Sequence, residues 1–276
     1  MPTVPGVRHA VYVPPFATFG DVNLMVDLAR EAEQAGWDGF FLWDHLLYED
    51  DVPFVDAWIA LAAIATATEH IRLGPLITPL PRRRPWKVAR ESVTLDHLSA
   101  GRLVLGVGLG IDFWREFGGF GGEAADDAER AALLDDGIEI ITRLWSGEVV
   151  TYEGSRLRVD GVRFLPAPLQ KPRIPIWSAV LWPPRASPVR RAARCDGVVP
   201  FRPDGPMTPD NVLELRAAIE RERADGAPFD ICLHGPPEQA PEFAAAGVTW
   251  FMMSFYPEEP LAEVRRIIER GPPRTA

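Results

Sequence analysis

The chain has 276 residues, 47% hydrophobic and 25% charged, which is enough for a large core with an ordinary charged surface. Its 29 basic and 39 acidic residues give a net charge of −10, which argues against nucleic acid or an anionic membrane as the main partner. The two cysteines lack CxxC spacing, and neither a secretory leader nor an apolar stretch of bilayer length is recognisable. A cytoplasmic protein is therefore expected.

Strand-like apolar runs alternate with helix-like periodicity along the whole chain. Strands are expected at residues 7–13, 39–43, 71–78, 102–107, 174–180, 196–201, 229–233 and 248–254. Helices are expected at residues 24–35, 56–68, 87–98, 129–145, 188–194, 209–225, 237–245 and 260–270. Eight strand-helix units in this length favour a single α/β domain, a closed (β/α)8 TIM barrel, over an open doubly wound sheet.

One segment interrupts this alternation after the fourth expected helix. Residues 149–165 alternate apolar and polar positions, with turn sequences at Glu153-Gly154 and Asp160-Gly161. A small β-hairpin is expected there, within an inserted hairpin and connector that covers residues 147–170 of the 1–276 barrel domain.

An acid and a histidine, Asp44 and His45, directly follow the second expected strand. In a parallel barrel, residues at the carboxyl ends of strands line a shared pocket. His45 there is either a hydrogen-bonded packing residue or a proton-handling group. The neighbouring carboxylate favours the second interpretation, because it can hold an imidazole in one tautomer and raise its basicity. A metal site is not predicted, since of the other histidines only His234 would share this rim.

The third expected strand contains Pro75, which cannot donate to a central ladder, so a bulge or break is predicted there. Such a bulge either adjusts barrel curvature or gives a flat ligand a surface to rest against. The following run Pro81-Arg-Arg-Arg-Pro85 is either a solvated face or the source of one arginine that meets an anionic group.

Two later loops also admit two interpretations. The loop 178–185 precedes a short helix with Arg190, Arg191 and Arg194 and could hold phosphate, although its prolines disturb a regular amide cradle. The loop 111–122 carries four aromatic residues that would form either satellite core packing or a mobile lid over an apolar substrate.

Five stretches carry a recognisable pattern: 35–45 (AGWDGFFLWDH), 71–79 (IRLGPLITP), 84–102 (RPWKVARESVTLDHLSAGR), 103–110 (LVLGVGLG) and 190–197 (RRAARCDG). Together they cover most of residues 8 to 200 in the right order. On these motifs the chain resembles the bacterial luciferase-like superfamily of flavin- and F420-dependent oxidoreductases, the luciferase-like monooxygenase family.

The resemblance implies a pocket that holds FMN or coenzyme F420, often in a homodimer. His45 would lie near the reactive edge of the ring, and Asp44 would orient it or meet the cofactor. A non-prolyl cis peptide between Pro75 and Leu76 would form the backing bulge, and glycines after strand four would leave space at the pocket mouth. A glycine pair that usually serves the cofactor phosphate is replaced here by serine and alanine. The cofactor-binding residues expected from the resemblance are Gly74, Pro75, Leu76, Thr78, Gly108, Gly110, Ser178 and Ala179.

The leading hypothesis is an oxidoreductase that uses reduced FMN, supplied by a separate flavin reductase, or F420 on a small, largely apolar substrate. An F420-dependent hydride transfer without oxygen activation is the alternative. Family members that oxidise sugar phosphates carry a tryptophan and a glutamate where this chain has Tyr48 or Glu49, and Ile111 or Asp112, so that activity is not favoured. A non-catalytic flavin-binding barrel and a metal-dependent barrel enzyme are the rivals from other classes.

Overall fold

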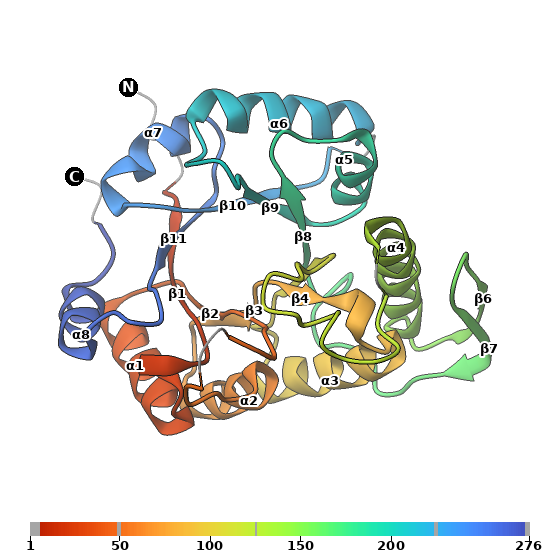
Figure 1. Cartoon of the computed structure of the whole chain (residues 1–276), viewed down its shortest axis with the longest axis horizontal. Coiled ribbons are helices and arrows are strands. Elements are labelled where there is room, and N and C mark those ends of the chain that lie inside the picture. The colour runs from red at the N-terminus through yellow and green to blue at the C-terminus, as the bar shows by residue number, and fades with distance from the viewer. Residues whose placement is uncertain (1–5, 49–50, 125, 224–225, 274–276) are drawn as a thin grey trace.

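The computed structural model describes residues 6–48, 51–124, 126–223 and 226–273. Parallel strands form a ring and helices surround it (Figure 1). The order around the ring is β3 (Arg72–Pro75), β2 (Gly39–Leu42), β1 (Arg8–Val13), β11 (Trp250–Ser254), β10 (Asp230–His234), β9 (Gly197–Phe201), β8 (Ile176–Leu181), β5 (Leu105–Gly108) and β4 (Thr78–Pro79). The predicted (β/α)8 barrel is confirmed, because β3 and β4 are two halves of one strand and the nine segments fill eight positions.

The third strand breaks at Pro75, where the sequence predicted a bulge or break. β3 pairs with β2 and ends at Pro75, whereas β4 starts at Thr78 and pairs with β5. A bridge between Leu73 and Leu103 completes the ring. The cis peptide joins Leu76 and Ile77, so the expectation of Pro75–Leu76 was wrong by one residue. The backbone N–H of Leu76 still donates to Leu42 at 2.8 Å, so the chain leaves the ladder only after Leu76.

The outer layer consists of eight α-helices over the described residues: α1 (Val22–Ala35), α2 (Ala57–Ala67), α3 (Pro85–Leu98), α4 (Asp127–Leu144), α5 (Ala186–Ala193), α6 (Pro209–Glu222), α7 (Ala240–Ala245) and α8 (Leu261–Arg270). Three short 3-10 turns are η1 (Ala17–Phe19), η2 (Leu80–Arg82) and η3 (Pro237–Gln239). Asp21 caps α1 by accepting from Asn23 and Leu24, and Gly36 ends it at φ 87°. The expected end of α6 at Asp225 lies outside the described residues.

The predicted hairpin stands outside the ring beside α4 as β6 (Val149–Glu153) and β7 (Arg158–Arg163) (Figure 1). Its turn is held by Asp136 of α4, whose carboxylate accepts from the backbone N–H groups of Arg156 at 2.6 Å and Leu157 at 2.9 Å. Burial raises the pKa of Asp136, but these backbone donors outweigh it and leave the pKa below its ordinary value. The second expected turn, at Asp160-Gly161, was wrong, because both residues lie within β7.

Large aromatic side chains fill the inside of the ring. The rings of Phe41, Trp177 and Trp250 lie 5.5 to 5.8 Å apart in tilted and edge arrangements. All three are buried, and they close the barrel below the carboxyl ends of the strands. The open space inside the barrel is therefore restricted to its two ends.

Gly74 is the position where ring closure leaves no room for a side chain. A Cβ there would lie 1.9 Å from the carbonyl oxygen of Val104, which is backbone and cannot rotate away. We expect Gly74→Ala to lower the free energy of unfolding by about 3 kcal/mol through overpacking, measured by urea denaturation. Gly121→Ala is the matched control, because nothing lies within 4 Å of its Cβ position. Equal stability of the two variants would contradict this account of closure.

Candidate active site

His45 lies at the carboxyl end of β2 and is paired with a residue far along the chain. Its Nδ1 lies 2.8 Å from Oε2 of Glu116, in the loop after β5. The other oxygen of Glu116 accepts from the backbone N–H groups of Leu46 and Leu47. Glu116 thus fixes both the imidazole and the chain that carries it.

The environment of Glu116 keeps its carboxylate ionised. Its side chain is only 1% exposed, and this burial by itself raises the pKa. The hydrogen bond and charge of His45, the charge of Arg82 and the backbone N–H of Leu46 outweigh burial, so the pKa of Glu116 is lowered. An ionised acceptor makes Nδ1 of His45 the donor, and a neutral His45 then carries its lone pair on Nε2.

Asp44, expected to orient His45, is directed elsewhere. Its Oδ2 accepts from the Nε1 of Trp58 at 2.9 Å and from the hydroxyl of Thr78 at 2.7 Å. Of the two roles expected for Asp44, holding His45 belongs to Glu116 instead, and contact with the cofactor stays a prediction. Asp44 instead links β2, α2 and β4, and Thr78 of the expected cofactor set is its hydrogen-bond donor.

The arginine run after β4 is largely internal. The side chain of Arg82 is 2% exposed, and its guanidinium contacts Glu116 at 3.0 Å and the backbone oxygen of Asp44 at 2.7 Å. Arg83 contacts Glu91 at 2.7 Å and lies 5.3 Å from the ring centre of Trp58. The solvated-face interpretation fails for Arg82, since the anionic group that it meets belongs to the protein itself.

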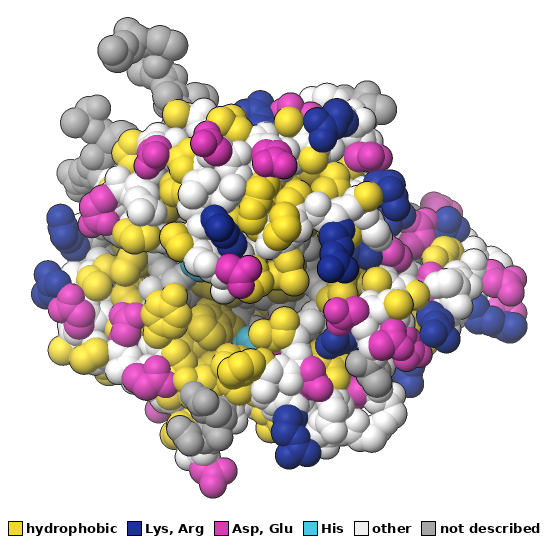
Figure 2. Space-filling model, turned by 45° about the horizontal axis from the view of Figure 1, so that its top comes forward, with side chains coloured by type: hydrophobic (Ala, Val, Ile, Leu, Met, Phe, Trp, Pro, Cys, Tyr) yellow, Lys and Arg dark blue, Asp and Glu magenta, His cyan; other side chains and the backbone are white. Residues whose placement is uncertain are grey.

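A bowl opens at the carboxyl ends of the strands above the aromatic floor. Side chains alternate along a strand, so the residues two positions beyond the buried inner residues Phe41, Trp177, Val199, Cys232 and Met252 also face inward. These side chains are half-buried, whereas the layer beneath is buried, and Figure 2 shows a hollow rimmed by hydrophobic side chains with histidine visible inside. By this alternation, and with Ile77 packed against the same inner residues, we infer that the bowl is lined by Trp43, Ile77, Ala179, Phe201, His234 and Ser254.

The expected cofactor residues divide between this bowl and the layers around it. Ala179 faces the bowl, whereas Ser178, one position earlier, faces the opposite side of the strand and is fully buried, and its assignment to the cofactor stays a prediction. A Cβ on Gly108 would lie 2.8 Å from Ile77 and 3.1 Å from Ala179. Gly108 therefore lets Ile77 and Ala179 pack closely against the strand, and its expected role in leaving space at the pocket mouth stays a prediction.

The remaining members of that set support the break in the third strand. Gly74 and Pro75 are buried in the ring, and the carbonyl of Leu76 accepts a hydrogen bond from the hydroxyl of Tyr12. Gly110 adopts φ 74°, and a Cβ there would lie 2.8 Å from Pro79 and Phe117, so it too serves close packing. The bowl wall contributed by this segment is the side chain of Ile77.

The aromatic loop 111–122 contains the satellite core packing that its sequence allowed, and the mobile lid stays a prediction. Phe117 is buried, and Trp114 packs with its ring centre 4.9 Å from that of His45. Phe113 is 76% exposed and Phe120 is 46% exposed. One part of the loop is thus satellite core, and the other presents apolar surface at the rim.

Sequence reasoning missed Glu116 and Tyr12. Glu116 is a lone carboxylate in the aromatic stretch Phe113-Trp114-Arg115-Glu116-Phe117, and a buried charge among aromatic residues is a signal of pairing. Tyr12 offered no such signal, because a tyrosine in a strand is an ordinary core residue. Two residues stand where the sugar-phosphate-oxidising members of the family carry a tryptophan. Of these, Tyr48 stacks on Phe16 with ring centres 4.5 Å apart, and Glu49 lies outside the described residues.

Other kinds of site were also sought in the part of the chain that the structure describes. No group of three or more histidine, cysteine, aspartate or glutamate residues could hold a metal ion. Within the same residues, no helix has both the length and the apolarity needed to cross a membrane.

The fold and the site place this chain among the (β/α)8 barrels that have a pocket at the carboxyl ends of their strands. Here a histidine-carboxylate pair lies beside that pocket. Within that class, the model of the luciferase-like monooxygenase family matches residues 7–266, and the chain belongs to this family. The resemblance found in the sequence motifs is confirmed.

Curated relatives include F420-dependent glucose-6-phosphate dehydrogenases. The protein of that name from Nakamurella multipartita is 31% identical over 79% of this chain and 64% of its own length. The one from Nocardia farcinica is 34% identical over 52% of this chain and 44% of its own length. The chain therefore spans about half to two thirds of the length of these relatives.

Solved structures share the fold at lower identity. The monooxygenase RslO1 from Streptomyces bottropensis has a TM-score of 0.76 at 20% identity, covering 95% of this chain and 96% of that one. The coenzyme F420-dependent tetrahydromethanopterin reductase from Methanopyrus kandleri has a TM-score of 0.75 at 18% identity, covering 96% of each chain.

The buried Glu116 carboxylate makes stability depend on pH. The pKa of Glu116 is lower in the folded protein than in the unfolded chain. Its contribution to the free energy of unfolding is therefore present above the ordinary glutamate pKa and is lost as the pH falls through the pKa of the folded state. We expect Glu116→Gln to be less stable than the parent at about pH 7, and the gap to shrink towards about pH 3. Thermal unfolding of both proteins at several pH values measures this difference in stability. Glu148→Gln, at an exposed position, should show no such gap; a gap for Glu116→Gln that does not change with pH would refute the charge-based explanation.

Proposed function

We propose that this protein is an oxidoreductase that binds the flat ring of F420 or FMN in the bowl and uses His45 to move a proton at the ring edge. The observation that carries this proposal is the His45–Glu116 pair beside the bowl. A carboxylate that accepts from Nδ1 fixes the tautomer and the plane of the imidazole. A protein that only carried a ligand would gain little from this arrangement.

The bowl suits a flat heteroaromatic ring. Buried polar atoms without a partner among the described residues include Nε1 of Trp43 and the hydroxyl of Ser254, both on side chains that line the bowl. The polar edge of a flavin or deazaflavin offers partners for such donors, while Ile77 and Ala179 supply an apolar wall for its face. These four residues are the ones proposed to hold the ring.

Between the two cofactors, we favour F420. Two relatives with more than 30% identity are named F420-dependent glucose-6-phosphate dehydrogenase. Bound F420 would supply hydride transfer at its ring. Removal of hydride from an alcohol carbon also requires a base for the hydroxyl proton, and the lone pair on Nε2 of His45 is suited to accept it.

The substrate is proposed to be small and largely apolar. Glu116 supplies beside His45 a glutamate in place of the one that Ile111 or Asp112 replaces, so that departure does not separate this chain from sugar-phosphate dehydrogenases. The nearest arginines, Arg82 and Arg83, are nevertheless paired with Glu116 and Glu91. The exposed rim residues Phe113, Phe120, Ile111 and Tyr256 are apolar or aromatic.

An FMN-dependent monooxygenase is the second candidate, supported by the apolar rim and by the shared fold of the monooxygenase RslO1. The discriminating experiment is titration of the purified protein with F420 and with FMN, each oxidised and reduced, followed by absorbance and fluorescence. Tight binding of F420 and substrate oxidation without oxygen consumption are expected. Preferred binding of reduced FMN with oxygen uptake would select the monooxygenase, and binding of neither would overturn the proposal.

We expect His45→Ala to bind the cofactor within about threefold of the parent but to lower kcat by about 100- to 10,000-fold, the usual contribution of a general base. His97→Ala is the matched control, since its Nε2 contacts the backbone oxygen of Ala167 on the outside of the barrel. Steady-state kinetics with the preferred cofactor measure both variants. Full activity of His45→Ala would remove the proposed proton-handling role.

A further inference from the structure

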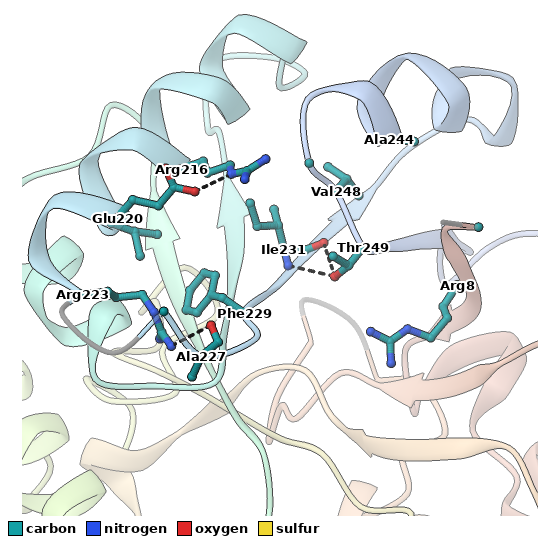
Figure 3. Close-up of a pocket in the computed structure, with 14 residues that line it drawn as sticks. Arg8, Arg216, Glu220, Arg223, Ala227, Phe229, Ile231, Ala244, Val248 and Thr249 are labelled. Atoms are coloured by element: carbon teal, nitrogen blue, oxygen red, sulfur yellow. Dashed lines mark hydrogen bonds and ion pairs between the residues drawn. The ribbon is translucent and has the colours of Figure 1, made fainter. Parts of the chain in front are cut away.

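The strand β10 has different surroundings at its two ends. Its amino end borders a cavity of about 720 Å³ (Figure 3), whose walls carry Arg8, Arg216 and Arg223. Arg8 and Arg216 lie 2.6 Å and 2.7 Å from carboxylate oxygens, and Arg223 donates to a backbone oxygen at 2.8 Å. These arginines are therefore already engaged by protein groups. The carboxyl end of β10 instead carries His234, at the bowl.

The alternation of side chains along β10 sets the direction of His234. Ile231 and Leu233 belong to the hydrophobic cluster between the strands and α6, whereas Cys232 belongs to the cluster inside the ring. His234 is the last residue of β10 and lies two positions beyond Cys232, so its side chain also points inward. Its ring centre lies 5.9 Å from that of Phe201, at the end of the neighbouring strand β9. His234 is therefore part of the wall of the bowl.

The imidazole of His234 is left available for a ligand. Within the described residues, no hydrogen bond joins either of its ring nitrogens to another protein group, whereas Nδ1 of His45 is held by Glu116. Burial lowers the pKa of His234, so the ring is neutral at about pH 7. A neutral imidazole offers one N–H donor and one lone pair. His234 can thus donate to a carbonyl oxygen or accept from a hydroxyl group.

His234 belongs to the side of the bowl that lies across from His45. In the ring of strands, with β3 and β4 sharing one position, β9 is equally far from β2 in both directions. Phe201 ends β9, and Leu181 at the end of β8 pairs with it in register, so both side chains face the same way. We call Leu181, Phe201 and His234 the far wall of the bowl.

The far wall combines apolar surface with one neutral hydrogen-bonding group. Leu181 and Phe201 favour an apolar body, because free energy is gained when water leaves their surface. None of the three side chains of the far wall carries a charge at about pH 7 that could pair with an ionic group. Arg202, the residue after Phe201, is turned towards α6, where its Nη1 lies 3.2 Å from Oδ1 of Asn211. An ion placed against the far wall would lose its hydration without a compensating partner, and an uncharged oxygen would not.

We propose that the far wall binds the end of the substrate that is remote from the reacting carbon, and that this end is an uncharged carbonyl or hydroxyl group hydrogen-bonded to His234. With His45 accepting the proton of the reacting hydroxyl, a step that rests on the proposed function, the substrate is a small uncharged alcohol with a second oxygen on its hydrocarbon framework. A sugar phosphate does not belong to this class, because its phosphate is charged.

NMR titration of the full-length protein, alone and with its preferred cofactor, tests this subsite with two probes of the same shape. Acetophenone carries a carbonyl oxygen on an aromatic body, and α-methylstyrene has a methylene group in place of that oxygen. The histidine ring signal that is missing from the spectrum of His234→Phe identifies His234. Acetophenone should shift this signal with a Kd below about 1 mM, and α-methylstyrene should bind at least about fivefold more weakly.

His234→Phe keeps an aromatic ring on the far wall but cannot form the hydrogen bond, so it should bind the two probes with equal affinity. His234→Gln has both a donor and an acceptor, and it should keep a preference for acetophenone of at least about twofold. His70→Phe is the matched control and should behave as the parent, because the side chain of His70 is 85% exposed and lies just before the amino end of β3. Melting temperatures establish that each variant is folded.

Three results would overturn the subsite: no binding of acetophenone to either form of the protein, equal affinities of the parent for the two probes, or an undiminished preference for acetophenone in His234→Phe. If the protein binds F420 or FMN but not acetophenone, the proposed function stands and the subsite fails. If acetophenone binds with the expected preference but neither cofactor binds, His234 is a ligand-binding residue of the bowl and the proposed oxidoreductase function fails.

Discussion

The ionised carboxylate of Glu116, buried where three parts of the chain meet, is the constraint on which the candidate site depends. It binds His45, Arg82 and the backbone after β2, so it joins the second strand, the turn after β4 and the loop after β5. A buried carboxylate costs several kcal/mol unless its oxygens are paired. Each partner is therefore needed by the others, and the position of the catalytic candidate His45 is a property of the whole network.

The broken third strand provides the second constraint. Its first half extends the ladder of β2 and its second half pairs with β5, and the residues between them place Ile77 on the wall of the bowl. Glycines on the neighbouring strand make this possible, since a Cβ on Gly106 would lie 2.6 Å from the carbonyl oxygen of Pro75. Gly106 therefore lets the neighbouring strand pack closely against the broken segment.

The two ends of the barrel differ in chemistry. The carboxyl end has an apolar bowl with paired charges behind its wall, which suits a flat ring and proton transfer. The amino end has an apolar base with three arginines around it. Because the aromatic layer of Phe41, Trp177 and Trp250 fills the ring between them, the two ends of the barrel are separated from each other.

Local sequence patterns were sufficient for the barrel and for the position of His45. Strand-length apolar runs, helix periodicity, the Asp21 cap and Pro75 inside a strand are all local signals, and the corresponding elements and the break follow from them. The family could also be recognised, because its motifs are contiguous. Asp44 was given the wrong partner because adjacency in sequence says nothing of direction, and two consecutive side chains after a strand point to different sides.

The sequence by itself determined the fold class, the family and the rim on which His45 lies. Only the tertiary structure decided that Glu116 and not Asp44 holds His45, that Arg82 is internal, that Ser178 faces the opposite side of its strand from Ala179, and that arginines from β1 and α6 surround a cavity at the other end. The physical reason is that pairing of charges and closure of cavities join residues separated by tens to hundreds of positions. Their distances depend on how the ring closes, which no local pattern encodes.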